Sequence, residues 1–242
     1  MGKVLLEVCV DSAAGFAEAV SGGADRIELC LALGVGGLTP SVGLMRAAAD
    51  CGVPVIAMIR PRAGDFVFGA GDVAVMLGDI TAVREAELAG VVIGASLADG
   101  RLDGAVLAEL MAEAAGLDVT LHRAIDLVPD WDEALDLAMA LGVRRVLTSG
   151  RALRAAEGVG DLARAFARVA GRLVVMPGAG VTAQTLPALR GLPLREVHAS
   201  CSVSVEAGGA ARAFGFASGG ERRVDRAAVA ALKAALADRQ AG

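Results

Sequence analysis

Two runs near the start of the chain share the pattern Glu-x-Cys. They are Leu5-Leu6-Glu7-Val8-Cys9 and Arg26-Ile27-Glu28-Leu29-Cys30. Alternate side chains of a β-strand share a face, so the glutamate and cysteine of each run point one way and the apolar residues point the other. A helical pattern near 12–22 separates the two runs. The stretch therefore predicts a strand–helix–strand unit that carries carboxylates and thiols on one face, an unusual composition for a hydrophobic core.

Short apolar runs alternate with helical patterns along the rest of the chain. The expected strands are 5–10, 26–30, 54–60, 90–95, 118–123, 144–149, 172–177 and 195–200. The expected helices are 12–22, 41–51, 72–89, 103–115, 131–141, 158–170, 182–190 and 225–239. This alternation, in a chain of roughly the usual 250 residues, predicts an α/β fold, a single (β/α)8 TIM-type barrel over 1–242, with a long Gly-rich loop at 207–220.

A doubly wound open sheet is the alternative fold. Its dinucleotide-binding fingerprint, Gly-x-Gly-x-x-Gly, follows the first strand directly. Here that position reads Val10-Asp11-Ser12-Ala13-Ala14-Gly15 and lacks the fingerprint. The barrel is therefore favoured, and no organic cofactor is expected.

The composition restricts the classes of function. The chain is 55% hydrophobic and has a net charge of -5, which argues against nucleic-acid binding because phosphate contact needs a basic face. No apolar run approaches the ~18 residues of a membrane helix, and the start of the chain lacks the layout of a signal peptide. The four cysteines form no Cys-x-x-Cys pair. We expect a cytoplasmic protein with reduced thiols and with neither nucleic acid nor membrane as a partner.

Several expected strands carry polar residues near their carboxyl ends, on the face that points into the barrel. Barrel enzymes place their chemistry at these carboxyl ends, and ionisable groups gathered in a cleft are candidates for function. Both histidines of the chain lie at such positions. The candidate catalytic residues are Glu7, Glu28, Arg60, His122, Asp126 and His198.

Each candidate also has a purely structural interpretation. The two glutamates could pair with Arg60 and Arg123 in an ion network inside the barrel. His122 could be a core histidine bonded to a backbone carbonyl. Asp126 could orient an arginine or cap the helix that follows. The sequence leaves these alternatives open.

Further polar residues and glycines surround the expected barrel mouth. The run Met176-Pro177-Gly178-Ala179-Gly180 follows the seventh expected strand, where barrels often bind phosphate, although a tight turn needs the same glycines. Arginine forks bind carboxylate or phosphate groups at two points. The candidate ligand-binding residues are Arg62, Asp65, Arg123, Thr148, Ser149, Gly178, Gly180 and Ser200.

A series of motifs, in order along the chain, resembles the CutC family. They are Glu-Val-Cys-Val-Asp-Ser (7–12), Gly-Ala-Asp-Arg-Ile-Glu-Leu-Cys (23–30), Gly-Gly-Leu-Thr-Pro-Ser (36–41), Met-Ile-Arg-Pro-Arg-x-Gly-Asp-Phe (58–66), His-Arg-Ala-x-Asp (122–126), Arg-Val-Leu-Thr-Ser-Gly (145–150), Met-Pro-Gly-Ala-Gly (176–180) and Glu-Val-His-x-Ser (196–200). The resemblance implies a cytoplasmic, self-associating TIM-type barrel named for copper homeostasis, with Cys9 and Cys30 as copper ligands. Two departures stand out: Ala63 replaces the family's usual glycine, and 201–220 match weakly.

Two main functions follow from these residues. Soft thiolates favour Cu(I), and in-register Cys9 and Cys30 on neighbouring strands would reach one ion, with Met58 as a conceivable third ligand. The alternative is an enzyme of isomerase, lyase or dehydratase type, in which histidine and glutamate transfer protons on a small sugar-like or anionic metabolite. A scaffold protein with a closed, apolar lumen is a third class. The expected partner is therefore a copper ion or a small-molecule ligand, and a homo-oligomer is expected.

Overall fold

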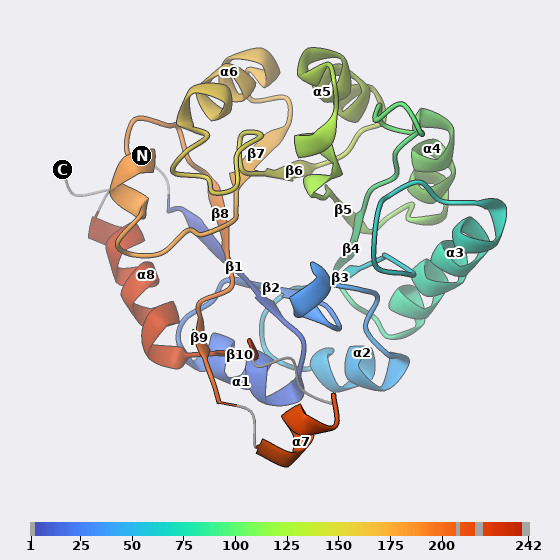
Figure 1. The fold of residues 1–242 in the computed structure, drawn as a ribbon. Helices are drawn as coiled ribbons and strands as arrows, with labels where there is room; N and C mark the ends of the chain where they lie inside the picture. The colour runs from blue at the N-terminus through green and yellow to red at the C-terminus, as the bar shows by residue number, and fades with distance from the viewer. Residues whose placement is uncertain (1–2, 207–208, 216–219, 239–242) are drawn as a thin grey trace.

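In the computed structural model, which describes residues 3–206, 209–215 and 220–238, eight parallel strands form a nearly closed barrel (Figure 1). The strands are β1 (Leu5–Val10), β2 (Arg26–Leu29), β3 (Val55–Met58), β4 (Gly90–Ile93), β5 (Asp118–Leu121), β6 (Arg145–Thr148), β7 (Val174–Pro177) and β8 (Glu196–Ala199). They follow the order β7-β6-β5-β4-β3-β2-β1-β8, and β7 packs beside β8. The predicted TIM-type barrel is confirmed.

Helices form a layer around the outside of the barrel (Figure 1). They are α1 (Ala13–Ser21), α2 (Val42–Ala48), α3 (Ala70–Glu85), α4 (Gly104–Glu113), α5 (Trp131–Ala140), α6 (Val159–Val169) and α8 (Arg226–Asp238), with 3-10 turns η1 (Leu33–Val35) and η2 (Arg123–Leu127). Side-chain oxygens cap several helix starts: Ser12 accepts a hydrogen bond from the Gly15 amide and Ser41 from the Leu44 amide. Such caps satisfy amides that the first helical turn leaves without partners.

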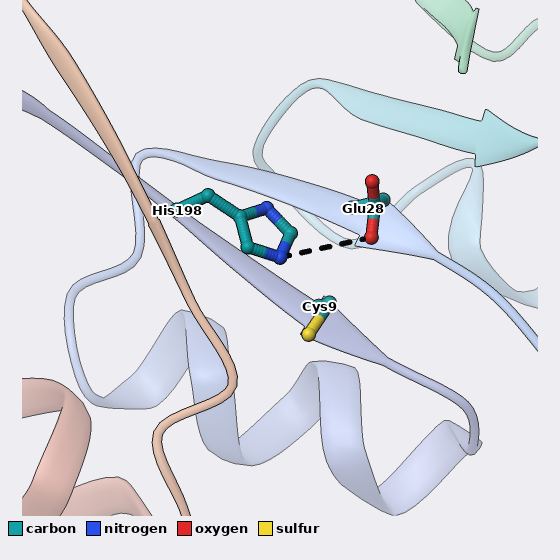
Figure 2. Close-up of side chains that lie close together, drawn as sticks. All are labelled: Cys9, Glu28 and His198. Atoms are coloured by element: carbon teal, nitrogen blue, oxygen red, sulfur yellow. Dashed lines mark ion pairs between the residues drawn. The ribbon is translucent and has the colours of Figure 1, made fainter. Parts of the chain in front are cut away.

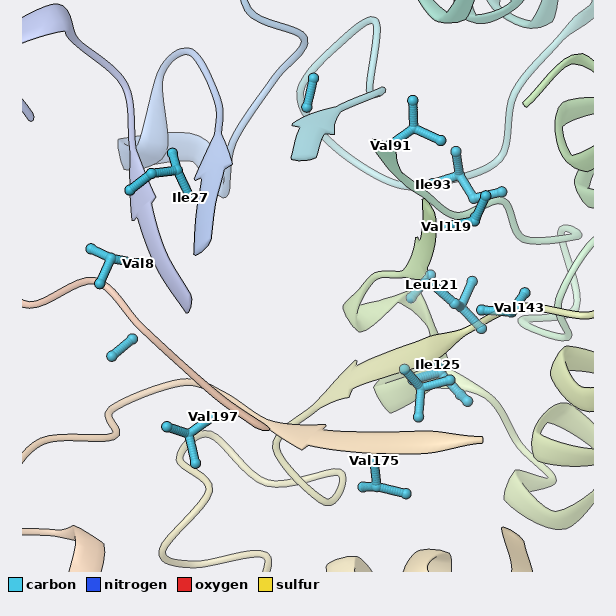
Figure 3. Close-up of a cluster of buried hydrophobic side chains, with 14 of the residues drawn as sticks. Val8, Ile27, Val91, Ile93, Val119, Leu121, Ile125, Val143, Val175 and Val197 are labelled. Atoms are coloured by element: carbon cyan, nitrogen blue, oxygen red, sulfur yellow. The ribbon is translucent and has the colours of Figure 1, made fainter. Parts of the chain in front are cut away.

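The hydrophobic core lies between the barrel and its helices. Val8, Ile27 and Val197 belong to this core and are fully buried (Figure 3). The residues that alternate with them lie on the opposite, inner face of the strands. The alternation follows from the pleat of a strand, which sends successive side chains to opposite faces. Apolar residues thus hold the helices in place and leave the inner face free for polar groups.

The segment after β7 differs from the prediction. A helix was expected over 182–190, but the structure forms only a 3-10 turn, η3 (Leu186–Leu189). Pro187 lies within this segment, lacks an amide hydrogen and disfavours an α conformation at the residue before it. A regular helix therefore cannot run through it.

The region around the predicted long loop is also more ordered than expected. Strands β9 (Ser202–Ser204) and β10 (Arg222–Val224) pair as an antiparallel ribbon, and a short helix, α7 (Gly209–Ala213), lies between them. Residues 207–208 and 216–219 of the predicted loop lie outside the described residues. Within the described part of the chain, no helix combines the length and apolar character needed to cross a bilayer.

Candidate functional site

Three potential metal ligands from three different strands meet inside the barrel. Cys9 on β1, Glu28 on β2 and His198 on β8 each offer a donor atom, and these atoms lie within 4.8 Å of one another (Figure 2). The register explains the meeting, because Cys9 pairs directly with Glu28 across β1 and β2, while Glu7 pairs with His198 across β1 and β8. We call Cys9, Glu28 and His198 the floor cluster.

The register does not place the two predicted thiol ligands opposite each other. Cys9 is paired with Glu28, so Cys30, which directly follows β2, lies two residues beyond the expected in-register position. Its thiol is fully buried and lies 3.5 Å from Glu28 Oε2, in an apolar cluster that includes Met58. Burial and then the charge of Glu28 raise the pKa of the Cys30 thiol well above its usual value. A thiolate at Cys30 is therefore disfavoured.

His198 lies between two glutamates. Its Nδ1 is 2.8 Å from Glu7 Oε1, and its Nε2 is 3.8 Å from Glu28 Oε2. Burial opposes a charge on the ring, but Glu28, Cys9 and Glu7 together raise the pKa of His198 well above its usual value. The surrounding groups therefore favour the protonated form of the imidazole.

The two glutamates have opposite electrostatic environments. Burial alone would raise the pKa of Glu7, but the hydrogen bond with His198 and the charge of Arg26 lower it to about 2. At Glu28 burial prevails over the attraction of His198, and the pKa is raised. Glu28 Oε1 is buried and has no hydrogen-bond partner among the described residues. Glu7 therefore stays ionised, while Glu28 can hold and release a proton.

An ion network that sequence reasoning missed lies below the floor cluster. Arg26 bridges Glu7 and Glu196, and Arg145 bridges Glu196 and Asp118. Glu7 thus pairs with Arg26, and among the described residues neither Glu7 nor Glu28 forms the expected ion pair with Arg60 or Arg123. Arg26 and Glu28 are two residues apart on one strand and therefore share a face. The inward position of Arg26 could have been predicted from this spacing.

The floor cluster opens into a pocket at the barrel mouth with a volume of about 230 Å³. Loops after β2, β3, β5, β7 and β8 supply its walls. The polar and aromatic wall residues are Arg60, Phe66, His122, Arg123, Ser200 and the backbone around Gly180. The pocket is open and has arginine and histidine side chains on its walls, which argues against the scaffold class with its closed, apolar lumen.

His122 and Arg60 stand side by side on one wall. His122 Nδ1 accepts a hydrogen bond from the Ala124 amide, so the ring proton is on Nε2, which has no partner among the described residues. Burial and then the charge of Arg60 lower the pKa of His122 to about 3. The Phe66 ring contacts both, at 4.6 Å from the imidazole centroid and 4.9 Å from the guanidinium carbon. His122 is thus a neutral hydrogen-bond donor. Its hydrogen-bond partner is the Ala124 amide and not the backbone carbonyl that the structural interpretation expected.

Asp126 organises the wall on the other side. Its carboxylate accepts hydrogen bonds from Arg123 Nε at 2.8 Å and from the Ser149 amide at 3.0 Å, and it also binds Thr148 Oγ1. Thr148 and Ser149 are fully buried, so they hold Asp126 rather than reach the pocket. Asp126 thus contacts the Arg123 guanidinium, as expected of a residue that orients an arginine.

Two predicted ligand-binding residues are engaged elsewhere. Arg62 donates to Asp65 at 3.0 Å and to Asp72 at 3.1 Å, and neither Arg62 nor Asp65 belongs to the described pocket lining. Arg62 was expected to point into the barrel from a longer third strand. It does not, because β3 ends at Met58 and the chain continues as a loop. These residues stabilise that loop.

The two predicted glycines have different roles. A Cβ on Gly178 would lie 2.4 Å from Leu147 Cδ1 and 3.3 Å from His198 Cβ, so Gly178 leaves room for these two side chains beside the floor cluster. Gly180 lines the pocket and has a φ of +71°. Ser200 also lines the pocket, and its hydroxyl accepts a hydrogen bond from Ser202.

Comparison with known proteins places this geometry in a family. The model of the CutC family matches residues 4–203. The chain belongs to the CutC family. A family protein CutC from Rhizobium meliloti (strain 1021) is 55% identical over 98% of this chain and 97% of its own length. One from Agrobacterium fabrum (strain C58) is 52% identical over 99% of this chain and 96% of its own.

A solved CutC structure agrees with the fold. The protein from Streptococcus agalactiae, described as a copper homeostasis protein CutC, is 28% identical and superposes with a TM-score of 0.78 over 81% of this chain and 98% of its own. The CutC match ends at Ser202–Val203, within β9. The floor cluster and the pocket walls therefore lie inside the family region, whereas most of the weakly matching segment 201–220 lies beyond it.

Proposed function

We propose that this CutC protein acts in copper homeostasis by binding Cu(I) at the floor cluster. The observation that carries the proposal is the convergence of Cys9, Glu28 and His198 within 4.8 Å at the base of an open pocket. The name of the Streptococcus agalactiae relative makes copper the first ion to test. The four cysteines are free, which suits a reducing compartment such as the cytoplasm.

The chemistry of the donors fits a soft monovalent ion. Thiolate sulfur and imidazole nitrogen both suit copper, so Cys9 and His198 form the primary pair, with the Glu28 carboxylate beside them. Metal ligands must be deprotonated, so the ion has to displace the proton that His198 holds. Cys30 stays a thiol behind Glu28 and is not a primary ligand.

A chelator competition titration with Cu(I), under reducing and oxygen-free conditions, tests this proposal. The wild type is expected to take up one ion per chain. Cys9→Ser should weaken binding by about tenfold to a hundredfold or more, because it removes the soft ligand. Cys30→Ser should bind like the wild type, and half-buried Cys51→Ser serves as the matched control.

The outcomes separate the two thiol hypotheses. Equal losses in Cys9→Ser and Cys30→Ser would restore the two-thiol site that the sequence predicted. Unchanged binding in Cys9→Ser would contradict the floor cluster as the copper site.

A second candidate function is proton-transfer catalysis on a small metabolite. The specific observation in its favour is the line of groups from ionised Glu7 through His198 to Glu28. Glu7 orients and charges the imidazole, and Glu28, with its raised pKa, can accept or donate a proton at the pocket. This arrangement suits isomerase, lyase or dehydratase chemistry.

Hydrogen exchange tests the catalytic proposal. Small hydroxy acids and sugar phosphates, incubated with the protein in D₂O, are followed by NMR for deuterium at carbon. Exchange with the wild type and none with Glu28→Gln is expected. Equal exchange rates in both proteins would remove Glu28 as the acid–base group.

A further inference from the structure

The pocket wall formed by the loop after β7 presents two unpaired backbone amides. Ala179 and Gly180 both line the pocket and both have positive φ angles, 70° and 71°. Their carbonyls are held outside, because Ala179 O accepts from the Ala155 amide and Gly180 O from Thr185 Oγ1. Their N–H groups have no acceptor among the described residues. Successive free amides in a turn form a concave site for an anion.

Arg123 supplies a positive charge to the same pocket. Its Nε and Nη2 are bound by Asp126 and Ser149, each at 2.8 Å, whereas Nη1 has no partner among the described residues. The Arg123 side chain is 41% exposed. The guanidinium is therefore oriented by the protein and keeps free donors for a ligand. A guanidinium held in this way matches the geometry of a carboxylate or phosphate.

Arg60 is a buried cation without a counterion. Its guanidinium donates only to the carbonyls of Val35, Gly37 and Gly64, and the described residues place no carboxylate within ion-pair distance. Arg60 is 4% exposed. Desolvating a charge without a partner of opposite sign is costly, so an anion in the adjoining pocket would stabilise it.

The charge balance of the pocket is opposite to that of the whole chain. The chain carries a net charge of -5, yet two arginines, Arg60 and Arg123, line the pocket against the single carboxylate of Glu28. Its volume of about 230 Å³ is below the ~300–1,000 Å³ typical of pockets for drug-sized ligands. The ligand is therefore small as well as negatively charged.

We propose that the pocket binds a small organic oxyanion, a phosphate ester or a carboxylate, with its charged group held by the amides of Ala179 and Gly180 and by Arg123. The neutral Nε2–H of His122 and the hydroxyl of Ser200 line the same space and can bind hydroxyl groups of that ligand. This site goes beyond the copper site, uses none of its ligands for the charged group and can be tested without metal.

Calorimetric titrations of metal-free protein with three ligands of one carbon skeleton test the proposal. Glycerol 3-phosphate represents phosphate esters, glycerate represents carboxylates and glycerol is the neutral control. At least one anion should bind at least tenfold more tightly than glycerol, and the preferred anion identifies the class. Arg123→Gln should weaken anion binding by about tenfold or more, because it removes a charge-assisted pair. Exposed Arg164→Gln, which changes the net charge equally, should not.

A direct measurement on the wild type covers the case in which Arg123→Gln fails to fold. Inorganic phosphate should shift the amide NMR resonances of Ala179 and Gly180 in a saturable way, and Cys9→Ser should show the same shifts. Equal affinity for glycerol and the anions, or unmoved Ala179 and Gly180 amides at saturating anion, would overturn the proposal. Either result would leave the copper titration unaffected.

Discussion

Glu7 and Glu28 show how one residue type acquires two properties from its surroundings. Both are buried glutamates on neighbouring strands, but Glu7 accepts from Arg26 and His198, whereas Glu28 has an oxygen without a partner. The pKa is lowered to about 2 at Glu7 and raised at Glu28. One carboxylate therefore fixes the site, and the other is free to react or to bind.

His122 gives a residue-scale prediction about pH. Its pKa of about 3 in the folded state lies below the usual 6.5, so between these values the unfolded chain binds a proton that the folded chain does not. Stability contributed by neutral His122 is complete above pH 6.5 and is lost as the pH falls towards 3. Relative to His122→Gln, the free energy of unfolding of the wild type should fall by up to about 1.4 kcal/mol per pH unit.

Urea unfolding at several pH values between 4 and 7 measures this difference. A difference between the two proteins that does not change with pH would show that folding does not lower the pKa of His122.

Strand alternation predicted which residues face into the barrel, and much of the candidate site follows from it. Glu28, His122 and His198 all lie where parity placed them. The alternation could not predict the ion-pair partners of these inward-facing residues. A pair such as Arg26 with Glu196 depends on which strands are neighbours and on how far the side chains reach. Arg62 was misplaced because the end of β3 could not be located from the apolar pattern alone.

At the scale of elements, the register between β1 and β2 decides which groups meet. The two Glu-x-Cys runs look equivalent in sequence, but the pairing of Glu7 with Arg26 offsets them by one alternate position. Cys9 therefore faces Glu28, and Cys30 lies beyond the floor cluster. Register depends on how a whole strand packs, so the sequence motifs alone did not determine it.

Close strand packing gives an element-scale prediction at Gly90. A Cβ at this position in β4 would lie 2.0 Å from the Asp118 carbonyl oxygen of β5, and backbone atoms cannot move away cheaply. Gly90→Ala should destabilise the protein by about 1–3 kcal/mol or more, as overpacking does.

Gly78 in α3 is the matched control, because no atom lies within 4 Å of its added Cβ. Gly78→Ala should stabilise by about 0.5–1 kcal/mol, since alanine loses less conformational freedom in a helix. Denaturation midpoints measure both changes, and equal effects of the two substitutions would contradict the packing of β4 on β5.

At the scale of the whole molecule, the buried ion network links strands that are distant in the sequence. Arg26, Glu196, Arg145 and Asp118 come from β2, β8, β6 and β5, so the network spans the barrel below the pocket. The barrel itself was predictable from the alternation of strands and helices. Self-association stays a prediction from the family resemblance.

Arg145 carries the whole-molecule prediction. It is 1% exposed and donates to Glu196 at 2.9 Å and to Asp118 at 2.8 Å. Arg145→Met leaves Glu196 with Arg26 alone and Asp118 with only the more distant Arg144, at 3.7 Å. Loss of this buried central cation should cost about 3–5 kcal/mol of stability. Arg168→Met, which removes a solvent-exposed pair with Asp136, should change stability little. Similar unfolding curves for the two variants would show that the network does not support the barrel.

The proposed copper function requires a metal site that joins β1, β2 and β8. Copper-edge anomalous scattering from crystals grown with Cu(I) under reducing conditions tests this directly. We predict one strong peak per chain, bonded to Cys9 Sγ and His198 Nε2 and adjacent to Glu28. A peak on Cys30 and Met58, or no ordered copper at the floor cluster, would contradict it.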